Sequence, residues 1–388
     1  MPADFLIVGG GIGGLVLAEL LGRGGKRVTV LERITAAPPW SRPEILWPKT
    51  FELLCTLLPR ERWEARSVLP LAGVRFFDGR EWRWAFSPQM LADAGVQPWS
   101  TNPNETRETL MTLSSFELCR GVQVQEVLQE QGRVVGVRGH NALTGGTQEW
   151  LAEWTVGDDG ANSLVRSACG IDLHAQIFPV DLCCFQAPWP AELPPREGHI
   201  WPNVANPQSG VLAVGFLPAP NGQGVGIVPA RPHADPAQAQ GAYRRHIESE
   251  PALLALLGNR QFPEDFQVVR RPWGHALRYG GPGALLIGDA AHPVSPAGGQ
   301  GANMSIADAR AVAELALAGE RDLVAAYERR RRRANSRSLR FTRAAVFASG
   351  LPQALLFNRL TAWLLSQASS RPSIASRFLR TVATAFLE

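Results

Sequence analysis

Three glycines near the start of the chain have the spacing of a dinucleotide-binding turn. Gly9, Gly11 and Gly14 lie between a short apolar run, Asp4–Val8, and a stretch of helical spacing, Leu15–Gly22. In such a turn the first glycine permits the tight bend, the second lets a pyrophosphate approach the backbone, and the third lets the helix pack on the strand. The free amides and the positive dipole end of the helix then bind the phosphates.

The run that follows this helix supplies an acidic residue for a ribose. Arg27–Leu31 is rich in β-branched residues and ends at Glu32, where a carboxylate accepts hydrogen bonds from the adenosine ribose hydroxyls. A strand, a helix and a second strand within about 30 residues favour a parallel sheet. We therefore predict an adenine dinucleotide site. Its expected contacts from this unit are Gly9, Gly11, Ile12, Gly13, Gly14, Glu32 and Arg33.

Two later segments join a strand-like run to a helix through polar, glycine-containing turns. Residues 157–166 (GDDGANSLVR) end one strand-like run and open a helix. Residues 288–303 (GDAAHPVSPAGGQGAN) follow a buried-strand run at 284–288 and continue into another helix. The first motif alone does not separate NAD from FAD, whereas these two segments do.

In their order and spacing, the motifs at 9–14, 157–166 and 288–303 resemble the single-component FAD-dependent aromatic hydroxylases, the p-hydroxybenzoate hydroxylase-like flavoprotein monooxygenases. The resemblance extends to about residue 335. It implies that Asp289 binds the ribityl chain of FAD and that Asp159 lies near the pyrophosphate and the nicotinamide path.

The resemblance also implies which residues surround the isoalloxazine ring. Catalysis would be centred on the flavin, with Pro296 and Gly299 near the ring and no general base named. Gly301, Ala302 and Asn303 complete the loop that would hold the ring. A reduced flavin carries negative charge near N1, and a glycine-rich turn that opens a helix presents backbone N–H groups to such a charge.

Two arginines match further FAD contacts of the family. Arg42 matches the arginine after the second strand, although Ser41 stands where the family commonly has glycine. Arg107 matches the arginine that opens the next long helix. The implied cofactors are FAD and, as a transient co-substrate, NAD(P)H; no metal is expected.

The implied reaction is a hydroxylation. Hydride would pass from NAD(P)H to FAD, O2 would add at the flavin C4a to give a hydroperoxide, and oxygen would enter an aromatic or quinone-like substrate. The sequence has no second GxGxxG, so NAD(P)H would have no Rossmann domain of its own. Three alternatives stay open: an FAD-dependent reductase of isoprenoid double bonds, a membrane-associated ring hydroxylase of quinone biosynthesis, and a non-catalytic FAD-binding redox sensor.

The order of elements predicts an α/β fold, α+β overall. We expect a GxGxxG Rossmann-like FAD-binding domain, a second β-sheet substrate domain and a helical C-terminus. The expected FAD-binding domain is discontinuous and comprises residues 1–72, 100–176 and 279–345. The expected substrate domain comprises 73–99 and 177–278, and residues 346–388 form a C-terminal helical segment.

Local sequence patterns predict individual elements within these domains. Gly73–Phe86 indicates a hairpin around Asp78-Gly79, a dipeptide that tolerates positive φ in a tight turn. Thr106–Cys119 has helical spacing, and a helix is expected near residues 237–257. Three runs are predicted as strands of a second small sheet: Val122–Val127, Arg133–Arg138 and Glu149–Val156.

Aromatic and histidine residues of the expected substrate domain are interpreted as structural. Trp82 and Trp84 alternate as strand residues do, with ring stacking on a substrate as the alternative. The other candidates in this domain are three histidines and a tyrosine: His199, His246, His275 and Tyr243. No pair among them has a spacing that would imply catalysis.

Composition is that of an ordinary globular protein. The 388 residues are 45% hydrophobic and 19% charged, which excludes a disordered chain. Net charge is +4, and only Lys26 and Lys49 are lysines among 39 cationic residues. The run Arg329–Arg333 is interpreted as a solvated helix face, with an anionic membrane surface as the alternative. No nucleic-acid-binding module is visible.

Cysteine usage and the chain termini point to the cytoplasm. Five cysteines without a CxxC pair argue against a disulfide framework and a structural zinc site. The N-terminus lacks the basic region of a signal peptide. Ala344–Leu365 is interrupted by Gly350 and Pro352, so two packed helices are expected rather than a membrane span. A peripheral membrane contact through the C-terminal helices is left open, and the oligomeric state is unknown.

Overall fold

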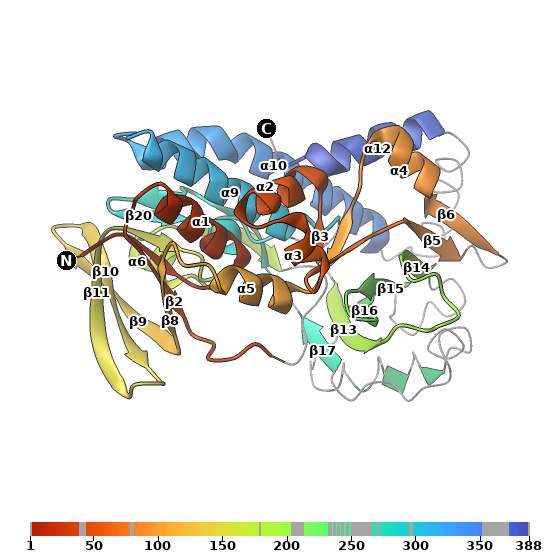
Figure 1. Ribbon diagram of the computed structural model, residues 1–388, viewed down its shortest axis with the longest axis horizontal. Helices are drawn as coiled ribbons and strands as arrows, with labels where there is room; N and C mark the ends of the chain where they lie inside the picture. The colour runs from red at the N-terminus through yellow and green to blue at the C-terminus, as the bar shows by residue number, and fades with distance from the viewer. Residues whose placement is uncertain are drawn as a thin grey trace.

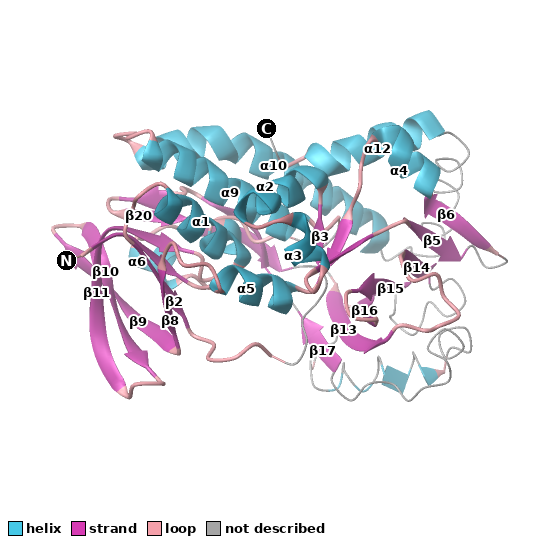
Figure 2. Ribbon diagram, viewed as in Figure 1, coloured by secondary structure: helices cyan, strands magenta, loops and turns pink. Residues whose placement is uncertain are grey.

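The computed structural model divides the chain into two main sheets joined by long helices. The described residues are 2–38, 44–77, 81–177, 180–202, 213–231, 266–269, 272–294, 298–350 and 372–386, with a few isolated positions between 235 and 249. A mostly parallel sheet lies toward one end of the molecule and a mostly antiparallel sheet toward the other (Figure 1). Most of the helices gather along one side of the molecule (Figure 2).

The first sheet is built around an apolar strand near the N-terminus. In spatial order its strands are β19 (Gly280–Gly281), β20 (Ala284–Leu286), β11 (Gly146–Gly157), β1 (Ala3–Val8), β2 (Val28–Glu32) and β8 (Glu117–Arg120). From β20 to β8 all neighbours run parallel. Residues Phe5–Val8 of the central strand are buried, as expected for a parallel strand that is covered on both faces.

Two sequence-based expectations about this sheet were wrong. The runs near 122, 133 and 149 form β9 (Val122–Glu130), β10 (Arg133–Asn141) and β11, which pair antiparallel as strands of one small sheet. This sheet is not separate, because the second half of β11 continues between β1 and β20. The helix predicted from the spacing of Thr106–Cys119 also does not extend through the second half of this range. Helix α5 (Pro103–Met111) ends early, and β8 follows because its backbone pairs with β2, which outweighs local propensity.

The second sheet combines segments from distant parts of the sequence. In spatial order its seven strands are β17 (Phe266–Val269), β13 (Asp181–Pro188), β16 (Gln223–Ala230), β15 (Ala213–Ala219), β14 (Glu197–Pro202), β5 (Gly73–Phe77) and β6 (Trp82–Phe86). Only the β14–β5 pair is parallel. The β5–β6 hairpin forms as predicted, although its Asp78-Gly79 turn lies outside the described residues.

Two small sheets accompany the large ones. The first is three-stranded, in the order β3 (Glu44–Leu46), β7 (Trp99–Thr101) and β4 (Val68–Pro70). The second pairs β12 (Leu173–Ile177) with β18 (Pro272–Ala276). Strand β15 of the seven-stranded sheet packs beside β4 and β7, so the three-stranded sheet bridges the two ends of the molecule.

The two tryptophans of the β5–β6 hairpin pack against protein groups. The Trp82 ring centroid lies 4.3 Å from that of Trp201 and 5.0 Å from that of His199, in both cases edge-on. The Arg75 guanidinium lies 4.1 Å from the centroid of Trp84. These contacts agree with the structural interpretation of both residues. His246 and Tyr243 lie outside the described residues.

The helices are mostly short, apart from two long ones in the C-terminal part. They are α1 (Ile12–Arg23), α2 (Pro48–Leu57), α3 (Arg60–Glu64), α4 (Pro88–Ala94), α5, α6 (Leu164–Ala168), the 3-10 helix η2 (Gly288–Ala290), α9 (Gln300–Leu317), α10 (Leu323–Gly350) and α12 (Pro372–Thr384). The predicted helix at 237–257 and the segment 351–371 lie outside the described residues, apart from isolated positions. No helix in the described residues is long and apolar enough to span a membrane.

The arginine run at 329–333 is not a uniformly solvated face, which corrects the sequence interpretation. Arg331 points inward and is 3% exposed. Its Nε donates to Asp308 Oδ1 at 2.9 Å, and its Nη1 donates to the Phe386 carbonyl at 2.7 Å. Its neighbour Arg330 pairs with Glu314 on the surface. A run of five arginines on a helix must place one of them toward the core, where a buried carboxylate compensates its charge.

We expect Arg331→Leu to destabilise the fold far more than Arg330→Leu. Removing one partner of a buried ion pair leaves an uncompensated charge and costs about 3–5 kcal/mol, whereas an exposed pair contributes about 0–1 kcal/mol. Urea unfolding of the two variants beside the wild type measures both values. Equal free energies of unfolding for the two variants would contradict the assignment of Arg331 to the core.

Candidate cofactor-binding site

The polar residues predicted to bind a dinucleotide meet at one edge of the parallel sheet. Val8 pairs with both Leu31 and Gly157, so β1, β2 and β11 end side by side, and β20 ends next to β11. The glycine turn Gly9–Gly14, Glu32, Asp158–Asp159 and Asp289 follow these four carboxyl ends. Ligands of open α/β sheets bind at this edge.

At Gly9 and Gly11 the glycine turn has no room for a side chain. Gly9 has a φ of 105°, and a Cβ there would lie 2.3 Å from the Asp158 carbonyl oxygen. A Cβ on Gly11 would lie 2.3 Å from Asp158 Oδ2. Gly11 is also the N-cap of α1, which therefore begins without a side-chain cap of its own.

The amides of this turn leave a cradle that suits a pyrophosphate. The Gly10 amide donates to Glu32 Oε2 at 2.8 Å, and the Gly14 amide donates to Asp158 Oδ2 at 2.9 Å. The amides of Gly11, Ile12 and Gly13 find no acceptor among the described residues. Unpaired amides at a helix N-terminus fit the phosphates of a dinucleotide such as FAD.

Glu32 and Arg107, which are predicted separately from the sequence as FAD contacts, are held together. Arg107 Nη2 lies 2.9 Å from Glu32 Oε2, and Arg107 Nε donates to the Gly10 carbonyl at 2.7 Å. Glu32 Oε1 accepts from the Ile34 amide at 2.7 Å. A carboxylate has about four acceptor positions, so three protein donors leave room for one ribose hydroxyl. Arg33 is exposed beyond the strand end.

Asp159 organises the turn that follows β11. Its Oδ2 accepts from the amides of Leu164 at 2.7 Å and Val165 at 3.3 Å, at the start of α6. Its Oδ1 is buried and has no partner in the described residues. Burial raises the pKa of Asp159, and its hydrogen bonds with Ser163 and the backbone oppose that rise. A buried oxygen without a partner is another position that suits a polar group of a ligand.

Asp289 lies in the turn η2, directly after β20. It is half-buried between Gly288 and Ala290, which are both buried. The Gly288 amide donates to Asp308 Oδ2 at 3.2 Å. The position of Asp289 is therefore set by the buried network around Asp308.

The sequence did not predict this network around Asp308. Asp308 Oδ2 also lies 2.5 Å from His292 Nε2, and Asp308 Oδ1 accepts from Asn335 Nδ2 at 3.1 Å. Burial alone would raise the pKa of Asp308, but His292 and Arg331 hold it below its ordinary range. The available signal was an acid directly flanked by the apolar residues Ala307 and Ala309 in α9, because a buried carboxylate needs partners.

A histidine and a tyrosine continue the network toward the two-stranded sheet. Asn335 Nδ2 donates to Tyr279 Oη at 3.2 Å, and Tyr279 Oη hydrogen-bonds His275 Nε2. Burial, with the charges of His292 and Arg332, lowers the pKa of His275 to about 3. His275 is therefore neutral at physiological pH, in agreement with its structural interpretation.

The start of α9 presents the other predicted part of the site. Gly298 and Gly299 both have positive φ, and the N-cap Gly299 has no side-chain cap to occupy the first amides of the helix. Gly301 and Ala302 lie in this first turn. Asn303 Nδ2 donates to the carbonyls of Ile45 at 2.7 Å and Gly299 at 2.6 Å. Arg42, Ser41 and Pro296 lie outside the described residues.

Two side chains fasten this turn to distant elements. The Trp47 amide donates to Asn303 Oδ1 at 3.0 Å, which ties the turn to the segment after β3. Gln300 Nε2 donates to the Val382 carbonyl of α12 at 3.0 Å. Asn303 was named from the sequence as a flavin contact, but in the structure its side chain holds protein backbone. The predicted FAD contacts of all these residues stay predictions.

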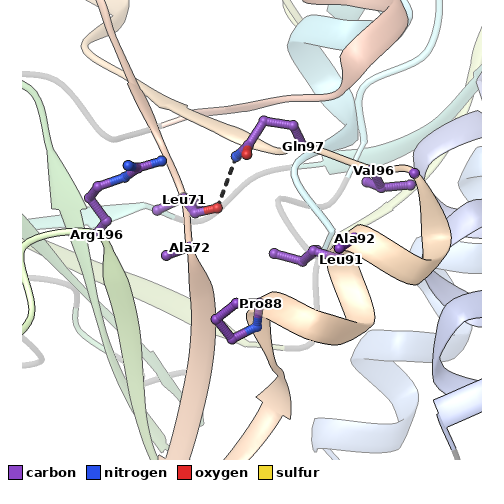
Figure 3. Close-up of a pocket in the computed structure, with 9 residues that line it drawn as sticks. Leu71, Ala72, Pro88, Leu91, Ala92, Val96, Gln97 and Arg196 are labelled. Atoms are coloured by element: carbon purple, nitrogen blue, oxygen red, sulfur yellow. Dashed lines mark hydrogen bonds between the residues drawn. The ribbon is translucent and has the colours of Figure 1, made fainter.

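A pocket of about 420 Å³ lies away from this edge, beside α4. Pro88, Leu91 and Ala92 of α4 face Leu71 and Ala72 across it (Figure 3). Its polar groups serve the protein itself. Gln97 Nε2 donates to the carbonyls of Leu71 and Pro98, and Arg196 Nε donates to that of Pro70.

Comparison with known proteins agrees with the geometry of the glycine turn. A family model described as an FAD binding domain matches residues 2–342. The 6-methylpretetramide 4-monooxygenase of Streptomyces rimosus is 30% identical over 335 residues, which cover 82% of this chain and 76% of that protein. The 3-demethoxyubiquinol 3-hydroxylase of Escherichia coli K12 is 27% identical over 328 residues, covering 81% and 79%.

A solved structure shares the fold. The p-nitrophenol 4-monooxygenase of Pseudomonas putida DLL-E4 superimposes with a TM-score of 0.77 at 19% identity, covering 97% of this chain and 96% of that one. At this identity the match concerns the fold alone. It confirms the predicted arrangement of a glycine-turn domain, a second sheet and C-terminal helices.

We expect Asp289→Ala to weaken FAD binding without unfolding the sheet. A carboxylate that accepts a ribityl hydroxyl contributes about 1.5–3 kcal/mol, or roughly 10- to 100-fold in affinity. Fluorescence titration of the apoprotein with FAD measures the change, and Asp172→Ala, at an exposed aspartate, is the control. Unchanged affinity in a folded Asp289→Ala variant would refute the ribityl assignment, and FMN instead of FAD in the purified protein would refute the dinucleotide itself.

Proposed function

The chain belongs to the FAD-dependent aromatic hydroxylase family of flavoproteins, and from that premise we propose that it uses NAD(P)H and O2 to hydroxylate an aromatic or quinone-like ring. It is an FAD-dependent oxidoreductase. The observation that carries the proposal is the match of residues 2–342 to the FAD-binding-domain family, on a chain whose only GxGxxG is at Gly9–Gly14. With no second nucleotide motif, the nicotinamide would visit the flavin transiently.

FAD supplies the redox chemistry, because it accepts hydride from a reduced nicotinamide and activates O2. The residues of this chain hold and orient it. The amides of Gly11–Gly13 and the Glu32–Arg107 pair would hold the adenosine diphosphate half, and Asp289 the ribityl chain. The first-turn amides of α9, after Gly298 and Gly299, would stabilise negative charge on the reduced ring.

We assign the substrate to the seven-stranded sheet, in line with the domain boundaries expected from the sequence. Its strand β15 packs beside the three-stranded sheet, and Ile45 of that small sheet is bound to Asn303 at the start of α9. This chain of contacts brings the seven-stranded sheet toward the turn where the flavin ring is expected. An apolar cover at this position would exclude water from the reactive flavin.

The comparisons bear on the alternatives. The relatives are named as hydroxylases and monooxygenases, which favours oxygen transfer over double-bond reduction and catalysis over redox sensing. The similarity to 3-demethoxyubiquinol 3-hydroxylase supports a quinol ring as one substrate class. For such a lipid-like substrate we keep a cytoplasmic protein with a peripheral membrane contact as part of the proposal. The exposed side chains of Ile374 and Phe378 on α12 support that contact.

We expect NAD(P)H oxidation to be slow without a ring substrate and accelerated by one, with one oxygen atom of O2 in the product. Phenols and quinol precursors are the compounds to screen, and mass spectrometry after turnover under labelled O2 identifies the source of the oxygen. Uncoupled production of hydrogen peroxide serves as the control for NAD(P)H oxidation without hydroxylation. Substrate turnover at the same rate without O2 would exclude the hydroxylase and favour the double-bond reductase.

A further inference from the structure

Asp158 places a carboxylate inside the glycine turn. It directly follows β11, and its Oδ2 accepts from the Gly14 amide at 2.9 Å. The same oxygen lies 2.3 Å from the position of a Cβ on Gly11 and 2.7 Å from that of a Cβ on Gly14. Its Oδ1 lies 3.3 Å from the position of a Cβ on Gly288, in the turn before Asp289. The carboxylate thus lies between the two turns that would hold the dinucleotide.

This carboxylate replaces a missing helix cap. Gly11 is the N-cap of α1 but has no side chain, since a side chain would collide with Asp158. An N-cap side chain normally accepts from the amide two or three positions further on. Asp158 accepts from that amide, Gly14, but from a neighbouring strand. Asp158 is therefore acidic for a structural reason, because it caps α1. Its carboxylate also lies at the positive end of the dipole of this helix.

The surroundings of Asp158 are poor in compensating charge. Asp159 and Asp289 act on it with like charge, and Arg107, which is already paired with Glu32, is the cation that opposes them. From α9 the neutral Ser305 faces Gly13 and Gly288, and Asp308, beyond Gly288, is paired with His292 and Arg331. Burial raises the pKa of Asp158 well above the ordinary value, while the Gly14 amide opposes the rise.

A dinucleotide brings a pyrophosphate to the helix terminus that already holds this carboxylate. Asp158 remains partly exposed at the glycine turn, so bound phosphates would cover its remaining open side. We propose that Asp158 takes up a proton from solvent when FAD binds, so that its neutral carboxyl group, rather than a carboxylate, lies beside the pyrophosphate. The neutral group keeps the Gly14 hydrogen bond through one oxygen and gains an O–H donor on the other. The proposal rests on FAD binding at the glycine turn and not on hydroxylation.

The sign of the resulting pH dependence follows from linkage. FAD favours the protonated form, so the pKa of Asp158 is higher in the complex than in the free protein. Between these two values the dissociation constant of FAD rises about tenfold per pH unit. Below both pKa values and above both pKa values, the titration of Asp158 does not change the dissociation constant of FAD.

The experiment measures FAD binding to the full-length apoprotein, without substrate. Flavin fluorescence gives the dissociation constant from about pH 5 to pH 9, a range that covers raised carboxyl pKa values. Calorimetry in two buffers of different ionisation enthalpy gives the number of protons taken up. Asp158→Asn keeps an oxygen that accepts from the Gly14 amide and removes the charge, and Asp172→Asn, at an exposed aspartate, is the matched control.

At pH values between the two pKa values, we expect the wild type and Asp172→Asn to take up about one proton per FAD and to lose affinity as pH rises. Asp158→Asn should take up none and should bind FAD at least about tenfold more tightly than the wild type at the alkaline end. FAD binding by the wild type without proton uptake at any pH from 5 to 9 overturns the proposal, and this result requires no variant to fold. Proton uptake that persists in Asp158→Asn overturns it as well, because the proton then belongs to another group. Absence of hydroxylation affects neither measurement.

Discussion

The buried carboxylate of Asp308 is the constraint on which the rest of the site depends. Removing it from water is costly, so each neighbouring element must supply a donor. The turn after β20 supplies the Gly288 amide and His292, while α10 supplies Arg331 and Asn335. Because the carboxylate belongs to α9 and its donors come from two other elements, satisfying one charge fixes the turn that carries Asp289, the axis of α9 and the inward face of α10 at the same time.

Helix α9 also connects the network around Asp308 to the elements at the other end of the molecule. At its first turn, Asn303 holds the backbone of Ile45 and Trp47, and the three-stranded sheet that contains Ile45 lies against the seven-stranded sheet. Helix α9 is therefore fixed by a charge in its middle and by amide hydrogen bonds at its start. Among the described residues, the two large sheets are therefore connected through α9 and the three-stranded sheet and not by a backbone pairing of their own strands.

Local patterns in the sequence were sufficient for the parts of the fold that depend on neighbouring residues. The unit β1–α1–β2, with Glu32 at its end, follows from apolar periodicity and three glycines. Features set by distant residues were not accessible. Strand β11 joins the parallel sheet through pairing with β1 and β20, and the inward direction of Arg331 depends on Asp308, 23 positions away. The sequence places Asp158 in the motif at 157–166. Its role as a helix cap depends on the Gly14 amide of α1, 144 positions earlier.

The contacts of α12 also bear on the order in which the elements of the protein fold during synthesis. Gln300 at the start of α9 hydrogen-bonds Val382, 82 residues later, and Arg331 hydrogen-bonds the Phe386 carbonyl, 55 residues later. During vectorial synthesis by the ribosome, residues 372–386 emerge after every other described element. The parallel sheet and its glycine turn can form on the nascent chain, but the turn expected at the flavin ring gains its last support only when α12 docks.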